Sequence, residues 1–124
     1  MKKFVRYIGV FLFVFFLATT IQAQNKPEQS SQIKIHRYVV ERDFPDGLSI
    51  PINEKGCSIV SGVVSKNAED NVTWVHSYVS ADKKKTFCIY DAPSPEAIKK
   101  AADKNGLPVG KITEVTVLDP YFYN

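Results

Sequence analysis

Histidine, cysteine and tryptophan are scarce in this chain, which has two histidines, two cysteines and one tryptophan among 124 residues. The spacing of Cys57 and Cys88 matches neither a structural zinc site nor a thioredoxin motif. One histidine alone does not make a metal site either. A metal centre in this protein therefore needs carboxylates beside an imidazole.

The chain also lacks an apolar run long enough to span a membrane. Its longest apolar run covers residues 8–18, which is shorter than the roughly 20 residues that a spanning helix needs. Three basic residues precede this run: Lys2, Lys3 and Arg6. With the small Ala23 after it, the pattern is typical of a secretory signal peptide over residues 1–23, and an uncleaved membrane anchor is the alternative. We expect an exported protein, periplasmic or extracellular.

The chain has a net charge of zero once residues 1–23 are removed. Residues 24–124 hold 13 Lys and Arg against 13 Asp and Glu, because three basic side chains and no acidic one leave with the leader. A neutral chain gives no support for nucleic acid or an anionic membrane as a partner. About 100 residues bury one modest core, so we predict one domain over residues 33–124 after a disordered, polar spacer over residues 24–32.

Hydrophobic spacing predicts four strands and two helices in that domain. Period-two alternation indicates strands over residues 33–44, 74–79, 86–91 and 109–118, and helical spacing indicates helices over residues 52–71 and 94–106. This order is that of an α+β, ferredoxin-like βαββαβ sandwich. In that fold a four-stranded antiparallel sheet carries both helices on one face.

Capping residues and apolar spacing define the two helices further. We expect Asn53 to cap the first helix, with Gly56 and Gly62 weakening it. Its predicted buried residues are Cys57, Val60, Val64 and Ala68. In the second helix Ser94 is the expected cap and Gly106 the end. Its predicted buried residues are Ile98, Ala101 and Ala102.

The two cysteines then fall on different elements, Cys57 on a helix and Cys88 on a strand. An oxidising compartment permits a disulfide between them. We expect two buried thiols, with the intramolecular bridge as the alternative.

The hairpin between the second and third predicted strands gathers aromatic and polar side chains. If residues 82–84 form a three-residue loop, His76 pairs with Tyr90, and Tyr78 pairs with Cys88. A face rich in aromatic rings is unfavourable in water, so we expect it to form a ligand cavity or a homodimer interface on the open side of the sheet. The residues predicted to line the cavity are Trp74, Tyr78, Cys88 and Tyr90.

His76 is the natural ligand for a divalent transition metal, because neutral imidazole binds nickel, copper and zinc. Glu41 and Glu114 are the carboxylates best placed to join it, since the fold sets the first strand between the third and the fourth. The alternatives are a hydrogen-bonded His76 and surface ion pairs of the two glutamates with residues such as Arg42 or Lys111.

Four segments of the domain carry a family resemblance. They are YVVER at residues 38–42, WVHSYV at 74–79, FCIY at 87–90 followed by Ala92-Pro93, and ITEV at 112–115 running into LDP at 118–120. With them the chain resembles a family of small proteins that includes nickel-binding, nickel-responsive members and is built as dimeric ferredoxin-like domains. The resemblance implies a homodimeric α/β barrel and a divalent metal, nickel, and it does not imply an enzyme. Members mostly begin at the first strand, so the leader departs from the pattern.

We therefore expect an exported binding protein that holds nickel, another divalent transition metal or a small ligand on the open sheet face of a homodimer. Two alternatives remain. One is a dimeric α/β-barrel enzyme in which His76, Tyr78 and Tyr90 act on a small organic substrate by acid–base chemistry. The other is a structural dimer that holds no ligand.

Overall fold

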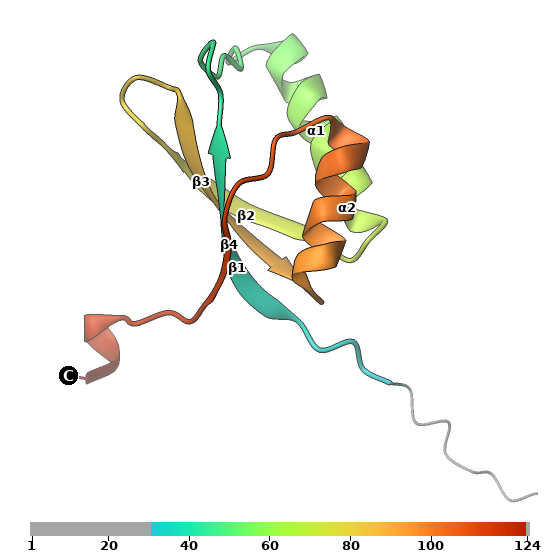
Figure 1. Ribbon diagram of the computed structural model, residues 1–124, viewed down its shortest axis with the longest axis vertical. Coiled ribbons are helices and arrows are strands. Elements are labelled where there is room, and N and C mark those ends of the chain that lie inside the picture. Colours follow the sequence, from blue (N-terminus) through green and yellow to red (C-terminus); the bar gives the residue numbers. More distant parts are fainter. Residues whose placement is uncertain (1–30, 124) are drawn as a thin grey trace, which may run out of the picture. The chain divides into compact units, whose positions relative to one another are not determined.

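The strands and helices follow one another in the predicted order in a computed structural model, which describes residues 31–123 (Figure 1). Their bounds are β1 His36–Asp43, α1 Glu54–Ala68, β2 Thr73–Val79, β3 Lys85–Ala92, α2 Pro95–Asn105, β4 Ile112–Val115 and a short 3-10 helix, η1, Pro120–Tyr123. The predicted signal peptide and all but the last two residues of the predicted spacer lie outside the described residues. In the described part, neither α1 nor α2 is long and apolar enough to cross a membrane.

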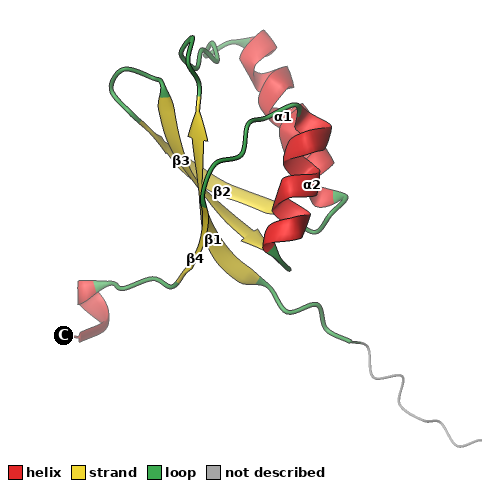
Figure 2. Ribbon diagram, in the orientation of Figure 1, coloured by secondary structure: helices red, strands yellow, loops and turns green. Residues whose placement is uncertain are grey.

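The sheet has the strand order β2-β3-β1-β4, and each neighbouring pair is antiparallel. Strand β1 therefore lies between β3 and β4, as predicted. Both helices lie on one side of the strands (Figure 2). This arrangement confirms the predicted ferredoxin-like α+β fold.

Helix α2 follows the local rules that its sequence suggested. The Ser94 hydroxyl accepts a hydrogen bond from the Ala97 N–H at 3.2 Å, and Pro95 takes the first helical position. Gly106 ends the helix in the left-handed conformation, with φ of 64°. The predicted buried residues Ile98, Ala101 and Ala102 are all buried, and Ile98 and Ala101 pack into the core beneath the helices.

Helix α1 begins at the predicted cap, where the Asn53 side chain accepts from the Gly56 N–H at 3.1 Å. The prediction of its buried residues is wrong for three of the four. Cys57, Val64 and Ala68 are exposed, whereas the buried residues of α1 are Gly56 and Asn67, with Val60 and Val63 half-buried. The reason is a close contact: a Cβ on Gly56 would lie 1.7 Å from the Pro51 carbonyl oxygen. This contact fixes which side of the helix turns inward.

The rotation of α1 also decides the state of the cysteines. Cys57 is exposed on α1 and Cys88 is buried in β3, and both are free thiols. The prediction of two buried thiols is therefore correct for Cys88 and wrong for Cys57. Cys57 and Cys88 do not form the disulfide that was the alternative.

The turn between β2 and β3 is longer than predicted. Val79 pairs with Thr86, and the Ser80 N–H donates to the Lys85 carbonyl, so the loop has four residues, Ala81–Lys84. Two features stabilise this loop. The backbone of Lys83 is in the left-handed conformation with φ of 61°, and the Asp82 carboxylate accepts a hydrogen bond from the Ser80 hydroxyl.

This longer loop shifts the hairpin register by one residue. Tyr78 pairs with Phe87 rather than with Cys88, and His76 pairs with Ile89 rather than with Tyr90. A bulge between Trp74 and His76 then moves the register again. Both predicted cross-strand pairs are therefore wrong, because a one-residue slip moves side chains to the other face of a sheet.

Candidate functional site

The β2 bulge places Trp74 and His76 on opposite faces of the sheet. Trp74 pairs with Tyr90, which is buried on the helix side, whereas His76 pairs with Ile89 on the open side. The sheet thus divides the side chains predicted to line one cavity. Trp74, Cys88 and Tyr90 face the helices, and Tyr78 lies with His76 on the open face. The acid–base set of the enzyme alternative is divided in the same way, because Tyr90 is on the helix side.

A shallow groove of about 440 Å³ lies on the open face. Its lining residues are Arg37, Val39, His76, Tyr78, Ile89, Val115, Thr116 and Val117. The His76 ring stands edge-on to the Tyr78 ring, with 5.0 Å between ring centroids and an interplanar angle of 88°. Both side chains are exposed. The groove therefore offers one accessible imidazole beside an apolar surface.

Ion pairs flank the groove. Arg37 donates two hydrogen bonds to the Asp91 carboxylate, at 2.7 and 2.8 Å, and they hold the pKa of Asp91 below its ordinary value. Glu41 lies on the same face, with its Oε1 3.9 Å from the Lys85 Nζ. The partner of Glu41 is therefore a lysine from β3 rather than His76.

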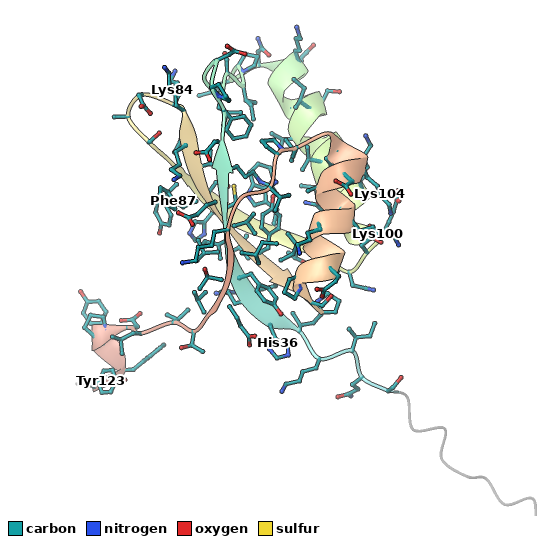
Figure 3. The ribbon with its side chains drawn as sticks, viewed as in Figure 1. His36, Lys84, Phe87, Lys100, Lys104 and Tyr123 are labelled. Atoms are coloured by element: carbon teal, nitrogen blue, oxygen red, sulfur yellow. The ribbon has the colours of Figure 1, made fainter. Side chains whose placement is uncertain are left out.

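Glu114 lies on the other face. It pairs with Tyr38, whose side chain is buried under the helices, and its carboxylate is 2.6 Å from the Nδ1 atom of His36. Figure 3 shows His36 at the start of β1. The structure therefore does not bring His76, Glu41 and Glu114 together. Among residues 31–123, no three His, Cys, Asp or Glu side chains come close enough to hold one metal ion.

A larger cavity, of about 620 Å³, lies between α1 and the sheet. Its floor consists of side chains from β1, β2 and β3, and α1 forms one wall. Loop residues from 44–50, from the β2–β3 turn and from the segment after α2 complete the lining. The lining residues are Arg42, Phe44, Leu48, Ser49, Ile50, Ile59, Val60, Val63, Trp74, Ser77, Val79, Lys83, Thr86, Cys88, Tyr90 and Leu107.

Arg42 is the unusual member of this lining, because its side chain is charged and only 3% exposed. One terminal nitrogen donates to the Pro108 carbonyl and the other to the Tyr90 hydroxyl at 3.3 Å. The guanidinium also lies over the Tyr90 ring, 5.6 Å from its centroid. Burial raises the pKa of Tyr90, so at neutral pH this phenol is uncharged and does not neutralise the arginine.

No acidic partner of Arg42 occurs among the described residues, and its Nε atom is buried without a hydrogen-bond acceptor there. The sequence suggests a surface ion pair with a glutamate for Arg42, whereas the structure buries its side chain. Alternation along β1 could have identified it, because Tyr38, Val40 and Arg42 share one face and the first two are core residues.

The sequence of this chain matches the model of a known protein family. The sequence model of the family described as "Nickel responsive protein SCO4226-like" matches residues 38–115, from β1 to the end of β4. The chain belongs to this family. Its membership confirms the resemblance found in the four sequence segments.

Solved structures add a likeness of fold to the family match. A crystal structure of SCO4226 from Streptomyces coelicolor A3(2) aligns with a TM-score of 0.53 and 14% sequence identity, over 67% of this chain and 99% of that one. At this identity the likeness shows the fold alone. Curated proteins give no match to the sequence.

Proposed function

We propose that this protein is an exported, nickel-responsive protein that binds nickel or another divalent transition metal at the open sheet face of a homodimer. Membership of the nickel-responsive family carries the proposal. The basic residues and apolar run of residues 1–23 support export.

One chain supplies only part of the ligands that a transition metal needs. An exposed imidazole at His76 is a ligand type that nickel accepts. A transition metal needs more donors than this, and no group of three potential ligands occurs among residues 31–123 of one chain. Two copies related by a two-fold axis through the open face would contribute two His76 side chains, and water molecules would fill the remaining coordination positions. The metal site and the dimer are therefore proposed together.

Exposed apolar side chains support a second copy as the partner. Tyr78 on the open face is 63% exposed, and Leu118 beyond β4 is 79% exposed. The terminal segment adds Tyr121, Phe122 and Tyr123, all of which are exposed. In Figure 3, Tyr123 lies away from the helices. Large apolar side chains that are exposed in one chain can be buried against a second copy, and this supports the dimer.

Calorimetric titration of the purified protein with Ni²⁺, combined with its mass in solution, tests the proposal. We expect a dimer that binds one metal ion per two chains, and we expect His76→Ala to abolish binding. His36→Ala is the matched control, since His36 lies on the helix side and pairs with Glu114. Wild-type protein that takes up no Ni²⁺ would contradict the proposal. So would a loss of binding in His36→Ala but not in His76→Ala.

A further inference from the structure

Arg42 holds a positive charge inside the cavity beneath α1 without a counter-charge among the described residues. An arginine stays protonated in proteins, so it cannot avoid the cost of burial by becoming neutral. Its two hydrogen bonds go to a carbonyl and an uncharged hydroxyl, and its Nε–H has no acceptor in the described part. A guanidinium has five N–H donors, these two contacts use two of them, and Arg42 is among the residues that line the cavity.

The rest of the cavity is suited to an apolar chain. Ile59, Val60 and Val63 of α1 line it, together with Ile50 and Leu107 from the loops. A volume of about 620 Å³ lies within the range of about 300–1,000 Å³ typical of small-molecule sites. The combination of apolar walls with one buried cation indicates a ligand that is apolar along most of its length and anionic at one end.

We propose that the cavity beneath α1 binds an aliphatic carboxylate, with the carboxylate on the guanidinium of Arg42 and the chain between α1 and the sheet. A carboxylate matches the planar fork of arginine with two parallel hydrogen bonds. Binding also supplies the missing counter-charge in a site where water screens little. This site is separate from the proposed metal site, which lies on the opposite face.

Trp74 provides the measurement, because it is the only tryptophan of the chain and lines the cavity. We would titrate the purified protein with decanoate, decanol and decyltrimethylammonium and follow tryptophan emission. Decanoate should shift the emission and bind at least about tenfold more tightly than decanol, as expected for a charge-assisted hydrogen bond. The cationic analogue, which has the same chain length, should bind most weakly.

Two pairs of variants locate the ligand. Arg42→Met should lower decanoate affinity to the level of decanol and leave decanol affinity unchanged. Arg37→Met, on the same strand but the opposite face, is its control and should change neither affinity. Val63→Phe should fill the cavity and abolish binding of both compounds. Val64→Phe, on the exposed side of α1, should not.

Three results would overturn the proposal. They are no emission shift with decanoate, equal affinities for decanoate and decanol in the wild-type protein, and an unchanged preference for decanoate in a folded Arg42→Met variant. If circular dichroism shows that Arg42→Met does not fold, the comparison of the three head groups on the wild-type protein still decides the question.

Discussion

Two glycines of α1 provide a direct test of how this helix packs. Gly56 and Gly62 lie on the same helix, and alanine at each position should change stability in opposite directions. A Cβ on Gly62 meets no atom within 4 Å. A Cβ on Gly56 would lie 1.7 Å from the oxygen and 2.8 Å from the carbon of the Pro51 carbonyl.

The expected magnitudes follow from these contacts. Gly62→Ala gains only helix propensity, so the free energy of unfolding should rise by about 0.5–1 kcal/mol. Gly56→Ala has the same gain but must displace a backbone carbonyl, and overpacking costs about 1–3 kcal/mol. A backbone carbonyl cannot rotate aside as the end of a side chain can, so we take the upper value of about 3 kcal/mol for the overpacking cost. After the gain in helix propensity is subtracted, the free energy of unfolding of Gly56→Ala should fall by about 2 kcal/mol.

Thermal and urea unfolding followed by circular dichroism would measure both variants. For a domain of this size, 1 kcal/mol corresponds to about 4–8 °C in Tm. Gly62→Ala should therefore raise Tm by a few degrees, and Gly56→Ala should lower it by roughly 8–16 °C. If Gly56→Ala is as stable as the wild type, Pro51 does not contact α1. The loop that carries Ile50 into the lining of the cavity would then not be held by this contact.

Two further predictions concern single side chains. Asp70 is buried in the turn between α1 and β2, and its carboxylate contacts Lys100 and Lys104 at 2.8 Å each. Both lysines belong to α2 (Figure 3). These contacts lower the pKa of Asp70 below the ordinary 3.8. The stability from this contact is therefore present at neutral pH and is lost as the pH falls below about 4. Asp70→Asn should lower the urea midpoint at pH 7, and the midpoint of this variant should decline less in acid than that of the wild type. An equal decline in both proteins would contradict this. With a thiol reagent, Cys57 should react in the folded protein and Cys88 only after unfolding, whereas two fast-reacting thiols in the folded protein would contradict the burial of Cys88.

The elements set by local chemistry could be predicted from the sequence. The cap at Ser94, the proline at the first position of α2 and the left-handed Gly106 act within a few residues of one another, so they need no knowledge of the fold. Element order then led to the sheet topology, because few arrangements suit this order of strands and helices.

The contents of the two sheet faces could not be predicted in the same way. Face assignment in the hairpin depends on loop length, and here a left-handed Lys83 stands where a glycine would have marked the turn. The bulge before His76 leaves no clear signal in the sequence. The inward side of α1 likewise depends on the contact between Gly56 and Pro51, which no periodicity records.

The bulge in β2 also explains how one hairpin serves two different surfaces. Without it, Trp74 and His76 would share a face, since residues two apart in a regular strand point the same way. With it, Trp74 lines the cavity that contains Arg42, and His76 lines the open groove. The two linings have no residue in common. The proposed metal site at the open face and the proposed carboxylate site under α1 therefore involve different side chains, so the failure of either proposal would leave the other standing.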